Sequence, residues 1–502
     1  MKELVMNWEK MLDPLAQKSF FAKREKKLMD EEDYAALRSP FGRDCDRILY
    51  SKSFRRLIHK TQVYISDANE HNRTRLTHTL EVARIAKVIC RNLFMNEELA
   101  EAIALGHDVG HAPFGHAGER QINRFLLGQE PFPTRVADKM EVKIRLPEDK
   151  KSGFKHNYQS IRVFTFLEKY HPSYDGLNLT IQTLEGILKH TKIGFPTEDF
   201  HFPGLNDKKG IFSKLDLNNK FSVTIEGQIA GIADEVAQVT HDTNDALGIG
   251  ELSVADLFNS KHIKKVIFND KMRYPKNAFK KCKNHQNREH CQIMSALLNH
   301  FIDFIIKEFR KKIAEISSRE RISNSEPFKL KEWLLTPKEE KNDEPYINDQ
   351  AFQDLKIIKN DLVLNNFFVN RMDSKGEYFI RNLFEAYLSN PRQLTDFSLD
   401  SYCLVKKKEL KKLGEKGFVN WLENKRKNYR VSDYLTEKEI SLIISFLDQE
   451  TDGREFRLLP SALIDKMIPY LAIDSDFMRT IADQISSMTD IFARHEYGRL
   501  YN

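Results

Sequence analysis

Residues 106–119 read GHDVGHAPFGHAGE, and this stretch decides the interpretation of the 502-residue sequence. It contains four glycines, one proline and three histidines, a composition that disfavours a continuous helix or strand. We interpret it as a turn between helices that is maintained for its backbone geometry and its side-chain chemistry. The plainer alternative is the end of a helix at which the histidines are incidental.

Helical periodicity dominates the sequence on both sides of this turn. Apolar residues recur at helical spacing in 76–90 and in 97–105. The same spacing predicts further helices over 159–169, 180–190, 223–246, 292–314, 352–364, 376–388, 435–448 and 461–492. Strand-like alternation is confined to short runs at 61–66 and 141–146, so we expect a mainly α protein with few short strands.

The composition fits a soluble globular protein, because 41% of the residues are apolar and 30% are charged. A net charge of +6 favours anionic partners but does not by itself indicate nucleic-acid binding. The five cysteines are scattered, which argues against a disulfide framework. The first residues do not have the pattern of a signal peptide, and no uncharged stretch approaches the ~20 apolar residues that span a bilayer. We therefore expect a cytoplasmic protein that does not bind membranes.

Imidazole and carboxylate side chains in and around the turn form a candidate metal site. His107 and Asp108 lie in the turn, and His78 and Asp234 lie in predicted helices. Two imidazoles and two carboxylates can hold a divalent ion in near-octahedral geometry, with positions left for water. Mn²⁺ and other transition metals suit these mixed donors, and Mg²⁺ suits them less well.

Several longer motifs lie along the chain. They are SFRRL at 53–57, KTQV at 60–63, RTRLTHTLEV at 73–82, the turn at 107–119, GFKHNYQSIR at 153–162, LEGI at 184–187, ADEVA at 233–237, THD at 240–242 and SMTD at 487–490. In this order they resemble the bacterial dGTP triphosphohydrolase (dGTPase) family of the HD-domain superfamily. The dense similarity covers roughly residues 38–250.

The resemblance implies an HD-domain helical bundle over 38–250 as the catalytic core. Around it we expect an N-terminal extension at 1–37, a helical segment with a charged linker at 251–350, and a C-terminal helical region at 351–502 that packs on the core. The family forms oligomers, often hexamers, so we also expect a homo-oligomer.

The resemblance implies metal-dependent hydrolysis of dGTP to deoxyguanosine and inorganic triphosphate, through attack on the α-phosphorus. Broad use of deoxynucleoside triphosphates (dNTPs) is the close second expectation. His116 and Glu119 are implied to be a catalytic pair, and their spacing brings them about one helical turn apart. His111 is a weaker candidate for the acid that protonates the leaving group. A divalent ion, either Mn²⁺, Mg²⁺ or another transition metal, is implied, with the ligands His78, His107, Asp108 and Asp234.

The resemblance and the helical spacing together predict six residues that bind the substrate: Gln62, Arg75, Lys189, Lys208, Gln238 and Asp242. Arg75 lies three residues before His78 on the same helical face, so it can reach a phosphate at the metal. The two lysines are the next candidates for the phosphates. Gln62 and Asp242 match family residues near the 3′-hydroxyl. Gln238 stands where the family usually has a tyrosine that packs against the deoxyribose.

Two alternatives to a dGTPase remain open. The first is another HD-domain phosphohydrolase or nucleotidase, which would act on cyclic dinucleotides, alarmones or nucleoside monophosphates. The implied catalytic pair and the spacing of the arginine from the first histidine argue against it. The second is a nucleotide-regulated protein that binds single-stranded DNA or RNA, because the run 406–430 alternates cations with aromatic residues. A solvated helix face is the plainer interpretation of that run.

Overall fold

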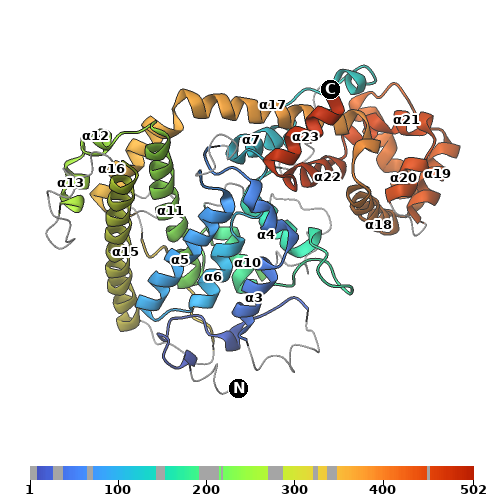
Figure 1. Ribbon diagram of the computed structural model, residues 1–502. Coiled ribbons are helices and arrows are strands. Elements are labelled where there is room, and N and C mark those ends of the chain that lie inside the picture. Colours follow the sequence, from blue (N-terminus) through green and yellow to red (C-terminus); the bar gives the residue numbers. More distant parts are fainter. Residues whose placement is uncertain are drawn as a thin grey trace. The chain divides into compact units, whose positions relative to one another are not determined.

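The computed structural model describes residues 8–26, 38–64, 72–142, 153–191, 214–215, 219–268, 286–319, 326–335, 347–448 and 453–501. Over these ranges the protein is mainly helical, which confirms the predicted fold class (Figure 1). β-Structure in the same ranges is limited to isolated bridges, such as the one between Thr61 and Thr74 in the run predicted as a strand. Among the helices of these ranges, none combines the length and apolar character needed to span a bilayer.

The chain divides into two compact units. Unit 1 comprises Met1–Gly110, Asn157–Gly194 and Ile211–Met372. Unit 2 comprises His111–His156, Phe195–Gly210 and Asp373–Asn502. In this grouping the described residues 111–142 and 153–156, which belong to the predicted core, pack with the C-terminal helices. The domain boundaries expected from the sequence stay a prediction.

Four helices pack side by side in unit 1 (Figure 1). Each begins at a residue whose side chain accepts a hydrogen bond from the first turn, which satisfies a backbone N–H that has no partner within the helix. The four are α5 (Arg75–Leu93), α6 (Glu97–Gly106), α10 (Ile181–Lys189) and α11 (Ile225–Ile249), with caps at Thr74, Asn96, Thr180 and Thr224.

Gly186 explains how α10 approaches α6 so closely. A Cβ atom at this position would lie 2.3 Å from a side-chain carbon of Ile103, so any larger residue would push the two helices apart. The other regular elements of unit 1 are η1 (Ser19–Phe21), α3 (Pro40–Leu49), α4 (Lys52–Arg56), η2 (Leu57–His59), η4 (Val163–Leu167), α12 (Val254–Leu257), α13 (Lys261–Ile267), α15 (Gln286–Arg319), α16 (Gln350–Ile358) and η8 (Lys359–Leu364). Two of the boundaries between the units fall in α9 (His156–Arg162) and α17 (Phe367–Ser389), and another falls between Gly110 and His111.

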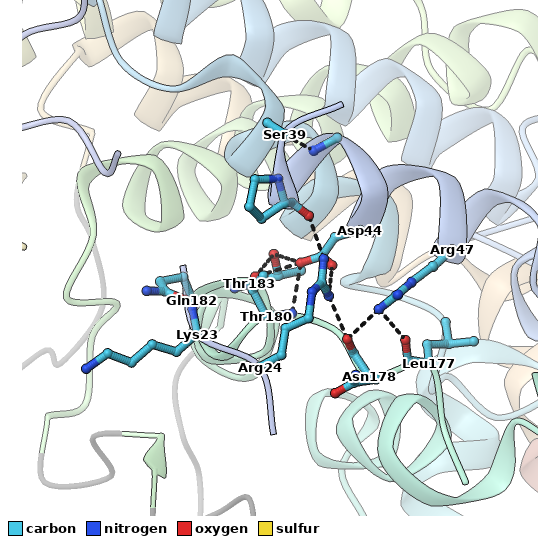
Figure 2. A network of polar contacts seen from close by, with 12 residues as sticks. Lys23, Arg24, Ser39, Asp44, Arg47, Leu177, Asn178, Thr180, Gln182 and Thr183 are labelled. Carbon is cyan, nitrogen blue, oxygen red and sulfur yellow. Dashed lines mark hydrogen bonds and ion pairs between the residues drawn. The ribbon is translucent and has the colours of Figure 1, made fainter. Parts of the chain in front are cut away.

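Asp44 of α3 fastens the N-terminal segment to the start of α10 (Figure 2). Oδ1 of Asp44 accepts a hydrogen bond from the guanidinium of Arg24 at 2.6 Å. Oδ2 accepts hydrogen bonds from the hydroxyls of Thr180 at 2.6 Å and Thr183 at 2.8 Å. The side chains of Arg24 and Asp44 are both buried, so the network holds the first turn of α10 in place against two other segments.

Unit 2 packs α7 (Gly115–Leu126) against C-terminal helices, and the last five residues of the glycine-rich stretch 106–119 form the start of this helix. Phe125 of α7 stacks on Phe384 of α17 with ring centroids 4.2 Å apart. The backbone N–H of Phe114 donates to the carboxylate of Asp490 at 2.9 Å. The other elements of unit 2 are α8 (Thr134–Ala137), η9 (Pro391–Gln393), α18 (Asp396–Tyr429), α19 (Glu437–Asp448), α20 (Gly453–Leu458), α21 (Ser461–Ala472), α22 (Ser475–Ser486) and α23 (Asp490–Tyr501).

The predicted helices differ from the observed ones mainly where a helix changes type or is interrupted. The segment 159–169 begins as α-helix and ends in the π-helical turn η4, and 352–364 likewise ends in the π-helical turn η8. The single helix predicted over 461–492 is three helices, α21, α22 and α23. Asp474 interrupts it, because its side chain caps the start of α22.

The basic run 406–430 lies in α18, whose helix is broken at Gly414 with φ 69°. Lys406 is buried and binds the carboxylates of Asp474 at 2.9 Å and Asp476 at 2.8 Å. Phe418 is buried too. Interpreting the whole run as a solvated face was therefore wrong for Lys406, because its ammonium faces the carboxylates of Asp476 in α22 and of Asp474, which caps α22. Single-stranded nucleic-acid binding stays a prediction.

Candidate metal centre and active site

Three side chains predicted to be metal ligands converge in unit 1. Nε2 of His78 lies 2.9 Å from Oδ1 of Asp234, and Nε2 of His107 lies 3.5 Å from the same oxygen. Each of the three offers one ligand atom, and these atoms all lie within 4.8 Å of one another. The side chains come from α5, the end of α6 and α11, so the packing of these helices builds the site.

Asp108, the fourth predicted ligand, lies beside His107 but is not in the group of His78, His107 and Asp234, whose ligand atoms all meet within 4.8 Å. Its Oδ2 is 3.5 Å from Nε2 of His107 and accepts a hydrogen bond from Arg75 at 2.6 Å. Ser160 holds the turn that carries it. The hydroxyl of Ser160 donates to the carbonyl of His107 at 3.0 Å and accepts from the backbone N–H of Gly110 at 2.9 Å. Ser160 thereby holds the backbone on both sides of Asp108, at His107 and at Gly110.

The hydrogen bonds of His107 leave one ring nitrogen available for a ligand. Nδ1 donates to the carbonyl of Ala104 at 2.6 Å, which places the proton on Nδ1. Nε2 is buried and has no hydrogen-bond partner among the described residues, since the two carboxylates stand 3.5 Å away. A buried ring nitrogen that faces two carboxylates fits the coordination of a cation, which would take the place of a proton on this nitrogen.

The charges of the cluster shift its pKa values in opposite directions. Burial lowers the pKa of His107, but the carboxylates of Asp108 and Asp234 outweigh burial and raise this pKa to about 9. Burial raises the pKa of Asp234, but His107 and His78 outweigh burial and hold this pKa well below its ordinary value. The site therefore favours a positive charge between the imidazoles and carboxylates, which is the electrostatic condition for binding a metal cation.

The donors fit a divalent transition metal. Two imidazole nitrogens and carboxylate oxygens form the mixed set that Mn²⁺, Fe²⁺, Co²⁺ and similar ions accept, whereas Mg²⁺ and Ca²⁺ prefer oxygen ligands alone. Four protein ligands would leave two positions of a six-coordinate ion for substrate and water.

His241 and Glu81 lie next to His78, and neither has a role that the sequence alone indicates. Nδ1 of His241 is 3.3 Å from Nδ1 of His78, and Nε2 of His241 is 2.8 Å from a carboxylate oxygen of Glu81. Burial lowers the pKa of His241 to about 4, so this imidazole is neutral at pH 7. The one sequence signal is that His241 follows Asp234 by about two helical turns, on the same face of α11.

Gln62 and Asp242, predicted to contact the sugar, present buried polar atoms that lack hydrogen-bond partners in the described part of the chain. Oε1 of Gln62 and Oδ2 of Asp242 are in this state, and so is the hydroxyl of Tyr64. Burial raises the pKa of Asp242 to about 6. Such atoms are rare in folded proteins and indicate where water or a ligand supplies the partner. Gln238 is half-buried on α11, one turn before Asp242.

The predicted phosphate-binding cations differ in what they contact. Arg75 is buried and bonded to Asp108 at 2.6 Å. Lys189 is buried and forms an ion pair with Glu185 at 2.7 Å, so its charge is already balanced. Lys208 lies outside the described residues.

Lys359 is a cation that sequence reasoning missed. It is buried at the start of η8, which packs on α11. Burial lowers its pKa, and the carboxylate of Asp242 is the largest influence in the opposite direction. π-Helical turns are rare and often found at functional sites. No local motif could have indicated Lys359, because its neighbours on α11 are far away in the sequence.

The predicted catalytic residues lie in unit 2, together with a histidine to which the sequence analysis gave no role. His111, His116, Glu119 and His156 each offer one ligand atom, all within 4.8 Å of one another. Nδ1 of His156 is 2.8 Å from Oε2 of Glu119, and Nδ1 of His111 is 3.8 Å from the same oxygen. The rings of His111 and His156 stack with centroids 3.9 Å apart.

Glu119 is thus surrounded by imidazoles. Burial raises its pKa, but His156, His111 and His116 outweigh burial and hold this pKa well below its ordinary value. His116 is the exposed member of the group, and its ring centroid is 5.1 Å from that of His111. An ionised carboxylate among three imidazoles can orient them and exchange protons with them, which is suited to acid–base catalysis.

The helices, the glycine-rich turn and the cluster of imidazoles and carboxylates define the class of protein. A family model described as HD domain matches residues 75–191. The match contains His78, His107 and Asp108, and it begins at the first residue of α5. This chain is an HD-domain protein.

Curated relatives identify the family within that class. A deoxyguanosinetriphosphate triphosphohydrolase-like protein of Bartonella quintana (strain Toulouse) is 30% identical over 415 residues, which cover 80% of this chain and 90% of the relative. One of Bartonella henselae is 33% identical over 363 residues, which cover 72% of this chain and 80% of the relative. The chain belongs to this family of deoxyguanosinetriphosphate triphosphohydrolase-like proteins.

Other relatives match over a shorter region. The deoxyguanosinetriphosphate triphosphohydrolase-like protein of Rhodopseudomonas palustris (strain BisB5) is 38% identical over 288 residues, or 56% of this chain. The match spans 64% of that relative, which is less than two thirds of its length.

Proposed function

We propose that this protein is a metal-dependent phosphohydrolase that converts dGTP to deoxyguanosine and inorganic triphosphate, with other dNTPs as further substrates. The observation that carries the proposal is that His78, His107 and Asp234 meet, with Asp108 beside His107, and that all but Asp234 lie in the matched HD domain. The names of the relatives supply the substrate class, and the chemistry of the cluster supplies the reaction class.

The four proposed ligands are His78, His107, Asp108 and Asp234. A divalent ion held by them would neutralise charge on the α-phosphate and promote deprotonation of an attacking water. Arg75 of α5 lies beside these ligands, because its guanidinium donates to Asp108. Its Nε is buried and lacks a hydrogen-bond partner among the described residues. We assign to Arg75 a contact with the phosphate chain.

We assign the sugar to the buried atoms of Gln62, Tyr64 and Asp242. Asp242 is mostly ionised at pH 7, because its pKa is about 6, and it then accepts hydrogen bonds from a sugar hydroxyl. Gln238 replaces the tyrosine that the family usually has against the deoxyribose. Its amide is smaller and polar, so we propose that this protein rejects a 2′-hydroxyl less strongly and has a broad substrate range.

We assign proton transfer to the group formed by His111, His116, Glu119 and His156. Two residues of chain separate Asp108 from His111, so their Cα atoms lie within about 11 Å of each other by covalent geometry alone. Glu119 holds an imidazole at 2.8 Å, which fixes its tautomer. The exposed ring of His116 is the proposed acid for the departing 5′-oxygen.

The test is a product assay. Purified protein is incubated with Mn²⁺ or Mg²⁺ and each dNTP and NTP in turn, and the products are separated by ion exchange. We expect triphosphate and deoxyguanosine from dGTP. Release of pyrophosphate or orthophosphate would contradict the proposal and support another phosphohydrolase.

Two variants sharpen this assay. His116→Ala should reduce turnover at least ~100-fold, as expected for loss of a general acid, while Mn²⁺ still binds. The matched control is His495→Ala, which removes an exposed histidine of α23 in the same unit and should leave turnover unchanged. Equal activity of both variants would remove His116 from the mechanism.

We further propose a homo-oligomer as the active form, on the basis of the family resemblance, and a cytoplasmic location, on the basis of the scattered cysteines. Light scattering of the purified protein measures the mass directly. A single mass equal to that of one chain, with full activity, would contradict the first of these proposals.

A further inference from the structure

The cluster behind His78 has a hydrogen-bonding pattern of its own. The chain of contacts runs from His78 through His241 to Glu81, with separations of 3.3 Å and 2.8 Å. Glu81 also accepts a hydrogen bond from Nε of Arg73 at 3.0 Å. The side chains of His78 and His241 are almost fully buried. Water therefore has little access to the contact between His78 and His241.

Only one arrangement of protons satisfies this chain when Nε2 of His78 faces Asp234 as a ligand atom. Nδ1 of His78 must then carry the proton and donate it to Nδ1 of His241. Nε2 of His241 carries the second proton and donates it to the Glu81 carboxylate. Each ring nitrogen is used once, and no donor faces another donor.

We propose that His241 and Glu81 are positioning residues that fix the tautomer and orientation of His78 for metal binding. The inference rests on the proposed metal centre and deepens it. Metal-ligating histidines commonly donate their other N–H to a carboxylate or carbonyl, and loss of that partner typically weakens metal binding 10–100-fold. Here the imidazole of His241 lies between the ligand His78 and the carboxylate of Glu81. The hydrogen bonds that orient His78 therefore involve α11 as well as α5.

His107 is oriented in a simpler way, by a single hydrogen bond from its second ring nitrogen. Its Nδ1 donates directly to the backbone carbonyl of Ala104 at 2.6 Å. A backbone acceptor one turn earlier cannot be removed by substitution of a side chain. The support of His78 rests instead on two side chains, so it can be dissected by mutation.

The contacts from His78 through His241 to Glu81 are called the relay below. A cavity beside the relay allows the positioning role of His241 to be tested by chemical rescue. It has a volume of about 320 Å³ and is lined by residues of α5, α11 and α15, with Glu81 and His241 in its wall. Removal of the His241 side chain would join its vacated space to this cavity. Exogenous imidazole could then enter and restore both hydrogen bonds.

The experiment measures Mn²⁺ affinity by titration calorimetry, without substrate. We expect His241→Gly to bind Mn²⁺ 10–100-fold more weakly than wild type. Addition of imidazole should recover most of that loss in the variant and should not strengthen binding by the wild type. 1-Methylimidazole should rescue poorly, because it cannot accept from His78 and donate to Glu81 at the same time.

Two further variants separate positioning from folding. His241→Gln keeps an acceptor and a donor at similar reach, so we expect Mn²⁺ affinity within about threefold of wild type. Arg84→Ala alters an exposed residue of the same cavity wall and should leave affinity unchanged. Far-ultraviolet circular dichroism in EDTA establishes that each variant is folded.

The outcomes distinguish the relay from the metal centre. If wild type binds Mn²⁺ and His241→Gly binds it equally well, the relay is wrong and the metal centre stands. Weakened binding by a folded variant that imidazole does not rescue also overturns the relay, since it indicates a general disturbance of α11. Wild-type protein that binds no Mn²⁺ would overturn both.

Discussion

Nε2 of His78 lies 2.9 Å from Oδ1 of Asp234, although 156 residues separate them in the sequence. The two side chains come from α5 and α11, which pack against each other. The candidate metal site therefore forms only when these helices are in place. A ligand that binds the folded site and not the unfolded chain must stabilise that packing.

Metal binding should raise the thermal stability of the protein. At a free Mn²⁺ concentration of 100 times the Kd, the expected gain is about 2.7 kcal/mol, or several °C in Tm. Differential scanning calorimetry in EDTA and in Mn²⁺ measures the shift. Asp234→Asn, which removes a charged ligand, should lose most of it. Equal shifts in wild type and variant would place the metal elsewhere.

Asp242 should lower the free energy of unfolding, although it is proposed to bind the sugar of the substrate. Its pKa rises from 3.8 unfolded to about 6 folded, which corresponds to about 3 kcal/mol. The folded protein binds more protons between about pH 4 and pH 6, so it loses stability as pH rises through that window. Asp242→Asn does not titrate there. In EDTA at pH 7 it should therefore unfold at higher denaturant concentration than wild type, while its KM for dGTP rises at least ~10-fold.

Parallel stability curves for wild type and Asp242→Asn from pH 4 to pH 7 would refute the assignment of a raised pKa. An unchanged KM in the variant would remove Asp242 from the sugar site. The two readouts are independent, because one is made without metal and the other with it.

Much of this site was predictable because its residues lie in recognisable local patterns. The glycine-rich turn indicates that His107 and Asp108 are functional. The helical spacing of the apolar residues around His78 indicates which face of the helix carries it. His241, by contrast, acquires its role only because α11 packs on α5. No local pattern encodes that contact. His156 is missed for the same reason, since its partnership with Glu119 depends on how α7 and the start of α9 approach each other.

The fold shows the same division between local and tertiary information. The periodicity of apolar residues predicts most helices, but the π-helical ends of two segments were not anticipated. The basic composition of 406–430 suggests exposure, yet Lys406 is buried. Its carboxylate partners lie near 475 in the sequence, so only the packing of α18 on α22 brings the charges together.

Lys359 should contribute to substrate binding. Its buried ammonium lies in the electrostatic range of Asp242 and Asp234, where a phosphate chain would gain a counter-charge. We expect Lys359→Met to raise the KM for dGTP at least ~10-fold with a smaller change in kcat, as for loss of a ground-state contact. Lys264→Met, the same change at an exposed lysine of α13, is the control. Similar KM values for the two variants would argue against this role.

Lys406 should stabilise unit 2. Its ammonium binds Asp474 at 2.9 Å and Asp476 at 2.8 Å, and Asp474 also accepts a hydrogen bond from Tyr402 at 2.8 Å. Removal of the cation leaves a buried carboxylate without its partner, which typically costs about 3–5 kcal/mol. Lys406→Met should therefore lower the urea midpoint markedly. The same substitution at the exposed Lys408 should leave it unchanged, and equal midpoints would contradict the burial of this network.

We propose that water attacks the α-phosphorus of a dNTP held at the cluster of His78, His107, Asp108 and Asp234 and displaces the 5′-oxygen, which leaves with the deoxynucleoside. Hydrolysis of dGTP in water enriched in oxygen-18, followed by mass spectrometry of both products, tests it most directly. The account predicts one oxygen-18 atom in the triphosphate and none in the deoxyguanosine, because the bond between phosphorus and the 5′-oxygen breaks. Label in the deoxyguanosine, or label in dGMP formed with pyrophosphate, would contradict it.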